Sequence, residues 1–159
     1  MKAFRRLLLV AATAGCALGQ GAKPVRPVTV TISTETPTIK SGSVLEIKAE
    51  LTNVSDLEVD CSEGISNMSG QSNNWLLDVR DVKGGKVPRK SYEHEELASV
   101  KILFHSLKPK ESLTASIIVS RQYDLSPGRY SIQVTRAFPN ESGVGYAPSN
   151  VLTVEVTAP

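Results

Sequence analysis

Few residues of this 159-residue chain have side chains that could carry out chemistry, and they are scattered along it. The two histidines are His105 and His94, and His94 lies in the run Tyr92-Glu93-His94-Glu95-Glu96. A metal site needs ligands that converge, whereas neighbouring residues of a loop or strand point apart. We therefore interpret the run as a solvated charged loop and predict that His105, which alternates with Phe104, faces outward.

A second set of oxygen ligands lies in the middle of the chain. The carboxylates are Asp56, Glu58, Asp60 and Glu63. Calcium is the metal that prefers clustered oxygen ligands, so it is the metal that such a set would suit. A solvated acidic loop explains the same residues without a metal, and it is the interpretation that we adopt; we predict no metal and no cofactor.

No nucleophile has the surroundings that catalysis requires. The serines lie in no G-x-S-x-G elbow, and no strand-to-helix turn is present to hold one. Cys61 is flanked by Asp60 and Glu63, whose negative charge is the wrong sign for lowering a thiol pKa. Gly84-Gly85 indicates a turn, because no phosphate-binding pattern follows it. These residues predict a protein that is not an enzyme.

The first residues have the layout of a secretory signal peptide. Lys2, Arg5 and Arg6 precede a short apolar run, and small residues follow it. We predict a signal peptide over 1–22, with cleavage near 19–22, and one domain over 23–159. The stretch Thr13-Ala14-Gly15-Cys16 also resembles a bacterial lipobox, although Thr13 stands where an aliphatic residue is usual. Lipidation of Cys16, giving a lipid anchor, is therefore the alternative to simple secretion.

Charge and cysteine count narrow the partners of the exported chain. Loss of 3 of the 18 basic residues with the signal peptide leaves 15 against 16 acidic ones, a net charge of −1. Such a chain has no basic field to attract nucleic acid. After residue 22 the sequence has no second long apolar run, so it predicts no transmembrane segment there. Cys61 would be the only remaining cysteine, and we expect it to be buried or half-buried, pairing between chains being the alternative.

Alternation of apolar and polar residues dominates the rest of the sequence. Because side chains on a strand point to opposite faces in turn, this period of two predicts half-buried strands. The segments are 28–33, 43–51, 74–82, 99–107, 111–120, 130–135 and 150–158. A further short edge strand could lie at 57–60, and the only helical turn that we expect lies at 92–99. This pattern predicts an all-β, antiparallel sandwich of about seven to eight strands.

Two turns support that architecture. Pro37 lies between the first two strong strands and predicts a break or a change of sheet. Ser126-Pro127-Gly128 predicts a turn, and Tyr130 follows at the position of a tyrosine corner, whose phenol bonds back to the chain. We expect Tyr123 to pack over the same connection and Trp75 to lie in the core.

Several motifs then resemble those of bacterial exported immunoglobulin-like domains. They are Ser41-Gly42, Leu51-Thr52-Asn53, the frame from Leu107 to Glu111, and Pro127 to Tyr130. The likeness spans about Val28 to Val156 and implies an immunoglobulin-like sandwich, a fold that hosts many unrelated roles. A weaker likeness is to the bacterial intracellular proteinase inhibitor family, which shares the Pro-Gly-x-Tyr turn; the export signal departs from that family's compartment.

These observations favour an exported, non-catalytic binding or accessory module of the bacterial cell envelope, secreted, periplasmic or lipid-anchored. Its partner would be another protein or an envelope component. An inhibitor of an extracytoplasmic protease is the alternative function. Rigid sandwiches commonly bind through their loops, so we expect the interaction surface in the loops at 62–74, 84–98 and 140–146, although an exposed edge strand could instead accept a partner strand. The candidate residues are Ser62, Asn67, Asn73, Asn74, Tyr92, His94, Asn140 and Tyr146.

Overall fold

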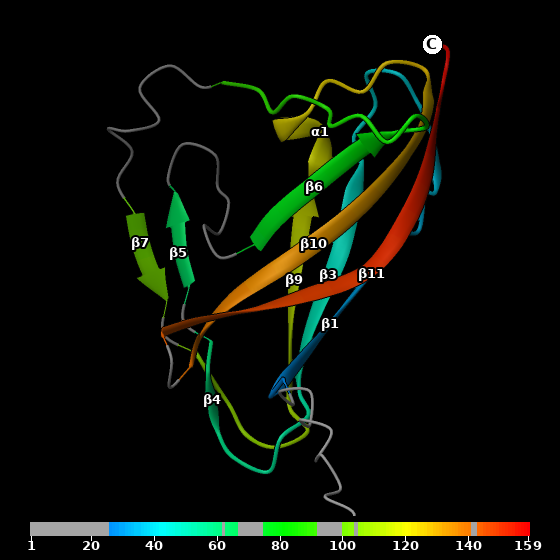
Figure 1. Ribbon diagram of the computed structural model, residues 1–159. Helices are drawn as coiled ribbons and strands as arrows, with labels where there is room; N and C mark the ends of the chain where they lie inside the picture. Colours follow the sequence, from blue (N-terminus) through cyan, green and yellow to red (C-terminus); the bar gives the residue numbers. More distant parts are fainter. Residues whose placement is uncertain (1–25, 62, 67–74, 92–99, 104, 141–142) are drawn as a thin grey trace, which may run out of the picture.

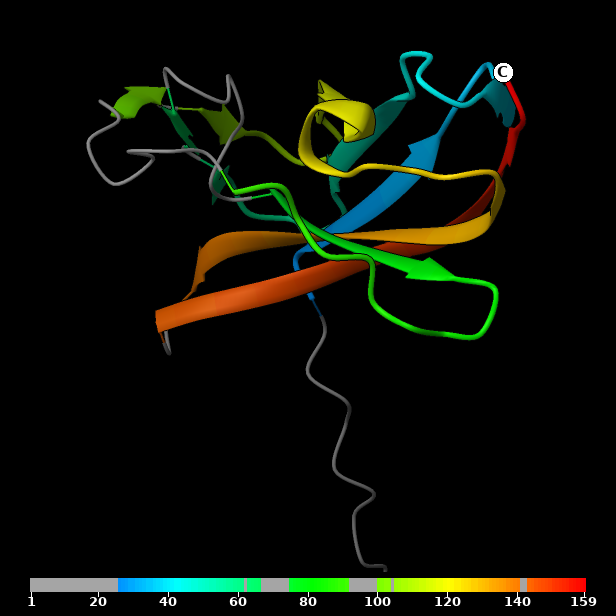
Figure 2. The ribbon, with the colours of Figure 1, turned by 90° about the horizontal axis from the view of Figure 1, so that it is seen from above.

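The computed structural model describes residues 26–61, 63–66, 75–91, 100–103, 105–140 and 143–159. These residues form eleven strands and one short helix. Seven of the strands belong to two main sheets, which lie as two layers with the hydrophobic core between them (Figure 1, Figure 2). The predicted all-β sandwich is therefore confirmed.

The first main sheet has three antiparallel strands in the order β1-β3-β9. They are β1 (Val28–Ser33), β3 (Glu46–Asn53) and β9 (Ser112–Ile118). Each strand places alternate residues in the core, and β3 shows the pattern most clearly, because Ile47, Ala49 and Leu51 are fully buried while Glu46 and Lys48 are exposed.

The second main sheet has four strands in the order β2-β11-β10-β6. They are β2 (Thr38–Lys40), β11 (Gly143–Thr157), β10 (Gly128–Asn140) and β6 (Trp75–Asp81). Only β2 runs parallel to its neighbour; the other pairs are antiparallel. Because β1 belongs to the first sheet and β2 to the second, the chain changes sheet around Pro37, as predicted. This division of the first segment between two packed antiparallel sheets is an immunoglobulin-like arrangement.

Two small sheets occupy a region that we expected to be mostly loop. One pairs β4 (Val59–Asp60) with β8 (Ser106–Leu107), and the other pairs β5 (Glu63–Ser66) with β7 (Val100–Leu103). The short strand expected at 57–60 is confirmed. The prediction of a loop over 62–74 is wrong at β5, and the single strand expected over 99–107 is two strands. Both differences arise because these strands pair with segments distant in sequence. The local alternation of apolar and polar residues does not reveal such pairing.

The strand expected over 111–120 ends early, in a helix that the sequence analysis did not anticipate. The helix α1 (Val119–Gln122) is a single turn, in which the Tyr123 amide donates to the carbonyl of Val119 (3.0 Å). Ser120 holds it in place, because its hydroxyl accepts from the Leu45 amide (3.2 Å) and its carbonyl accepts from Lys90 Nζ (3.1 Å). The helical turn expected at 92–99 lies outside the described residues.

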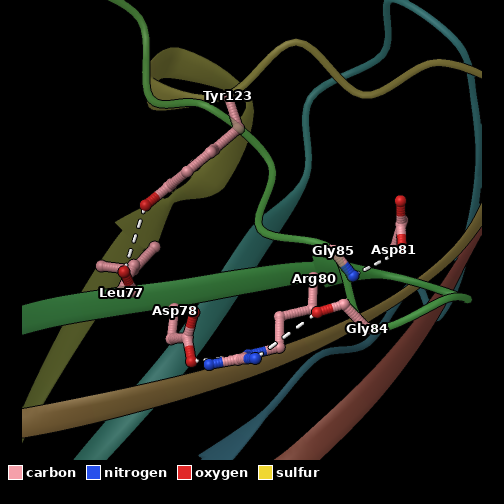
Figure 3. Close-up of polar contacts among 7 residues, drawn as sticks. All are labelled: Leu77, Asp78, Arg80, Asp81, Gly84, Gly85 and Tyr123. Carbon is pink, nitrogen blue, oxygen red and sulfur yellow. Dashed lines mark hydrogen bonds and ion pairs between the residues drawn. The ribbon is translucent and has the colours of Figure 1, made fainter.

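The predicted tyrosine corner is present. The Tyr130 hydroxyl donates to the carbonyl of Ser126 (2.8 Å), and the ring is buried. Tyr123 is buried as well, and its hydroxyl donates to the carbonyl of Leu77 on β6 (3.1 Å; Figure 3). Hydrogen bonds from the two phenols therefore hold both ends of the connection that precedes β10.

One arginine, Arg136, is fully buried in the core beside Trp75. Arg136 on β10 is fully buried, and its guanidinium carbon lies 4.9 Å from the centre of the Trp75 ring. Its Nη2 donates to the carbonyl of Cys61, which is also fully buried. The expectations of a core Trp75 and a buried Cys61 are confirmed. Arg136 continues the buried face of β10 and was not predicted as core, because long cationic side chains are rarely fully buried.

Candidate functional site

The solvent side of the second main sheet carries an apolar surface. Eight large hydrophobic residues are exposed in the described part of the chain, and four of them are on this side: Leu76 (48% exposed), Val144 (60%), Tyr146 (54%) and Val151 (59%). Pro148 is exposed between the last two. We call these five residues the outer apolar face.

Strand register gathers these residues. Leu76 on β6 is opposite Thr135 on β10, and Thr135 is opposite Pro148 on β11. In the neighbouring rows, Tyr146 is opposite Ala137 and Val151 is opposite Gln133. Directly opposed residues of antiparallel strands point to the same side of the sheet. The outer apolar face thus combines residues of β6 and β11 on one side of the sheet, with Thr135 of β10 between them.

A β-bulge makes that surface possible. The register of β10 and β11 shifts between Gln133 and Thr135, which places an extra residue on β11. Because side chains alternate, the shift lets Tyr146 and Pro148 point outward on one side of the bulge and Val151 on the other. The alternation that the sequence shows over 150–158 starts at the bulge and predicts nothing for 144–148.

The polar residues of the bulge tie it to the first sheet. Ser149 is buried, and its hydroxyl accepts from the Val134 amide (3.0 Å) and donates to the carbonyl of Asn150 (2.6 Å). The Asn150 side chain accepts from the Ile32 amide (2.8 Å) and donates to the Ile32 carbonyl (3.1 Å). The bulge is therefore held on both sides, which gives the outer apolar face a fixed backbone.

The remainder of the same sheet surface is polar. Arg80 Nε bonds to Asp78 on the same strand (2.9 Å), and its Nη1 reaches the carbonyl of Gly84 (3.4 Å; Figure 3). Ser131 lies in the next position between Arg80 and Thr153. The sheet surface thus has an apolar half beside a polar half.

A polar cavity of about 320 Å³ lies at one end of the sandwich. The Lys90 ammonium at its wall pairs with Asp124 (2.7 Å) and donates to the carbonyl of Ser120. Burial raises the pKa of the Tyr123 phenol, which Arg89 opposes and Asp78 reinforces. Asp124 thus neutralises Lys90, and these contacts hold neighbouring turns together. The lining residues are Ile39, Ser41, Gly42, Ser43, Lys90, Ser120, Tyr123, Asp124, Leu125 and Ser126.

The structure places few of the predicted interaction residues. Ser62, Asn67, Asn73, Asn74, Tyr92 and His94, together with Cys16, lie outside the described residues. Of the predicted loop at 84–98, the part up to residue 91 is described, and backbone bonds from Val87 to Val79 and from Lys90 to Gln122 hold it against the body.

The prediction of a loop over 140–146 is wrong. β10 continues through Asn140 and β11 begins at Gly143, and these two residues pair with each other. Tyr146 therefore lies on a strand, not on a loop. It is the one predicted candidate that belongs to the outer apolar face; the sequence analysis missed the other four members, because exposure depends on the register of three strands.

The described residues show no metal centre or membrane-spanning helix. No group of three or more histidine, cysteine or acidic residues is placed to hold a metal ion within the part of the chain that the structure covers. His105 is half-buried. None of the helices in this part is long and apolar enough to cross a membrane.

The fold and the surface define an immunoglobulin-like sandwich with an exposed apolar sheet face. No family model and no curated protein matches the chain. Among solved structures, the CARDB domain of a Pyrococcus furiosus protein in complex with di-metal ions is 16% identical, covers 83% of this chain and 94% of its own, and has a TM-score of 0.45. AggA, the major subunit of aggregative adherence fimbriae type I from Escherichia coli, is 17% identical, covers 84% and 95%, and has a TM-score of 0.37. At these values, neither similarity carries an argument about this chain.

Proposed function

We propose that this protein is an exported, non-catalytic immunoglobulin-like module of the bacterial cell envelope that binds another protein or an envelope component. The outer apolar face is the observation that supports this proposal. Its residues take no part in the core, because the core lies on the opposite side of the same strands. Contiguous exposed apolar surface that a monomer does not need for its own packing is typical of interaction sites.

The composition of the surface favours a protein partner. Tyr146 offers a large rigid contact with a polar end, and tyrosine is enriched in protein interfaces. Val144, Pro148 and Val151 surround it on β11 with side chains that lose little entropy on binding. The polar half of the sheet, with Arg80 and Asp78, would form the rim of such an interface.

Affinity capture tests this proposal with two matched variants. Purified chain is exposed to envelope and culture extracts of its source, as wild type, as the double variant Tyr146→Lys with Val151→Lys, and as Thr153→Lys. Thr153 lies on the same strand and the same side of the sheet, outside the outer apolar face. We expect one partner to be retained by wild type and Thr153→Lys and lost by the double variant. Equal capture by all three would contradict the proposal.

The identity of the captured protein decides between the two functions. A protease whose activity falls to zero at one chain per protease would replace the accessory role by the inhibitor role. A partner that is not a protease, or a protease that keeps its activity in the complex, would support the binding module.

The export part of the proposal rests on residues 1–22 and has its own test. Mass spectrometry of the chain expressed in a bacterial host should find a new N-terminus near residues 19–22. A mature chain starting at Cys16 with an added lipid, lost in Cys16→Ser, would instead establish the anchored form. Recovery of the intact N-terminus from the cytoplasm would contradict export.

A further inference from the structure

The backbone of β9 presents an unsatisfied edge. Its neighbour β3 lies on one side, and the hydrogen bonds at the two ends of this pair show which residues face it. The Val119 amide donates to the carbonyl of Leu45, and the Asn53 amide donates to the carbonyl of Glu111. Because backbone groups alternate in direction along a strand, the odd-numbered residues from 111 to 119 bond to β3. The amides of Ser112, Thr114, Ser116 and Ile118 and the carbonyls of the first three point the other way, whereas the carbonyl of Ile118, the N-cap of α1, accepts the first bond of that helix.

Apart from that helix bond, nothing in the described part of the chain bonds to those four residues from the outer side. The strand order ends at β9, and the described hydrogen bonds place no donor or acceptor against its outward backbone. Ser112, Thr114 and Ser116 are exposed, and Ile118 is half-buried. The row of backbone groups is therefore accessible to a partner.

The sequence of this edge also lacks the features that discourage pairing. Natural edge strands commonly carry a charge, a proline or a bulge that prevents another strand from adding to them. Ser112–Ile118 reads SLTASII, which has no charged residue, proline or glycine, and its register with β3 is regular throughout. None of these seven residues therefore blocks the addition of a strand along the outward side of β9.

Of the other long edges, the chain itself closes β6 at three positions and β1 at one. On β6, the Leu77 carbonyl accepts from Tyr123, the Val79 carbonyl accepts from Val87, and the Asp81 amide donates to Gly85. On β1, the Asn150 side chain occupies both backbone groups of Ile32. These closures show that the fold has local means of covering an edge, and β9 receives none of them from the described residues.

We propose that the β9 edge binds one extended segment of a partner protein as an additional strand. Only a strand can satisfy a regular row of alternating amides and carbonyls, which fixes the chemistry of the occupant. The β5–β7 sheet lies on the same side of the molecule as this edge in both views (Figure 1, Figure 2), so a second copy that brought its whole sheet to β9 would lie beside β5–β7, and a single extended segment is the smaller occupant.

The side chains of β9 determine what that segment looks like. Leu113, Ala115 and Ile117 point toward the core side, and Ile117 is buried. Thr114 and Ser116 point to solvent. Because opposed residues share a side of the sheet, the bound segment carries apolar residues opposite the first group and small polar residues opposite the second.

Amide hydrogen exchange tests the inference directly. In the free chain, we expect the amides of residues 112, 114, 116 and 118 to exchange at least about tenfold faster than those of 113, 115 and 117. The probe is the peptide acetyl-Lys-Val-Thr-Val-Thr-Val-Thr-Lys-amide, at saturating concentration. It should slow exchange at the four even-numbered positions by about tenfold or more. The same peptide with N-methylated valines and threonines keeps its side chains, loses its donors, and should leave exchange unchanged.

Variants separate this inference from the proposed function. Thr114→Lys places a charge on the edge strand opposite Glu50 of β3 and should abolish the peptide effect without unfolding the chain. The double variant Tyr146→Lys with Val151→Lys should retain it, because those residues lie on the other sheet.

Three results would overturn the inference. Slow exchange at the even-numbered positions in the free, dilute chain would show that the edge is already covered. Unchanged exchange with saturating peptide would show that it does not accept a strand. Protection that appears with rising chain concentration alone would show that a second copy, and not a partner segment, occupies the edge.

Discussion

β6 and β9 are both outermost strands, but the chain treats their outer backbone groups differently. Beyond β6, the turn from Asp81 to Gly85 brings residues 85–87 back along the strand, and Tyr123 reaches the strand from the connection that follows α1. Beyond β9, the chain turns into α1 and leaves the strand. The difference shows that edge closure depends on other segments of the chain, near or distant in sequence, and does not come with the strand itself.

The same contrast appears in side-chain chemistry. β6 carries Asp78, Arg80 and Asp81, so its edge is charged as well as covered. β9 is uncharged and uncovered within the described chain. Among the described residues, one edge is thus protected in two ways and the other in neither, and the proposed strand pairing rests on this difference.

A proline substitution on β9 should have the largest effect on stability among the changes that test this comparison. Ala115 donates its amide to β3, opposite Ala49, whereas the Thr114 amide points outward. Ala115→Pro should therefore lower the free energy of unfolding by about 3 kcal/mol or more, because it removes a ladder hydrogen bond and distorts the strand. Thr114→Pro should cost less than about 1 kcal/mol, since proline is tolerated on a free edge. Urea denaturation measures both, and equal losses would show that the outward amide of Thr114 is also engaged.

Opening the turn beside β6 should have an intermediate effect. Asp81 Oδ1 accepts from the amides of Lys83 and Gly85, both at 2.8 Å. Figure 3 shows the bond from Gly85. Asp81→Ala should lower stability by about 1–2 kcal/mol through loss of these two bonds. The Val87 amide, which depends on the turn for its bond to Val79, should then exchange faster. Asp56→Ala, an exposed change in another turn, is the control; unaltered exchange at Val87 would contradict the closure.

Removing the phenol that reaches β6 should have a smaller effect. Tyr123→Phe deletes the bond to the Leu77 carbonyl and should cost about 0.5–1.5 kcal/mol at neutral pH. Tyr146→Phe, an exposed change on the other side of the sheet, should be nearly neutral and serves as the control. A cost at Tyr123 no greater than at Tyr146 would contradict its role in closing the edge.

The same substitution has a pH signature. Burial raises the pKa of Tyr123 in the folded state, so above the ordinary tyrosine value of about 10 the folded chain retains a proton that the unfolded chain has lost. Stability should therefore fall as the pH rises beyond that value, and it should be independent of this group below it. Tyr123→Phe should show a shallower alkaline decline than wild type in urea titrations. Parallel curves would contradict the assignment.

The sequence predicted the strands whose alternation is local and uninterrupted. Ile47, Ala49 and Leu51 alternate with charged residues, and their burial follows. It also predicted Tyr130 and Pro37, because turn chemistry acts over a few residues. Prediction failed at β5, whose partner β7 is distant in sequence. It also failed at 140–146, where the residues before and after this segment continue as paired strands although their sequence shows no clear alternation.

The outer apolar face could be predicted only in part, at Tyr146. Leu76 precedes the other members by many residues, and nothing local relates them. In the sequence, an apolar residue on the exposed side of a half-buried strand only looks like a break in the alternation of apolar and polar residues. The β-bulge near Ser149 causes this ambiguity, since it exchanges the two faces of β11 partway along the strand.

By itself, the sequence determined the class of fold, because a period of two forces apolar residues to one side of each strand and burial of those sides requires a second sheet. It also determined the turns, through proline, glycine and tyrosine at fixed offsets. The tertiary structure alone decided which edges are closed and which apolar residues remain outside. Those outcomes depend on hydrogen bonds and registers between segments far apart in the chain, such as Asn150 with Ile32 and Tyr123 with Leu77.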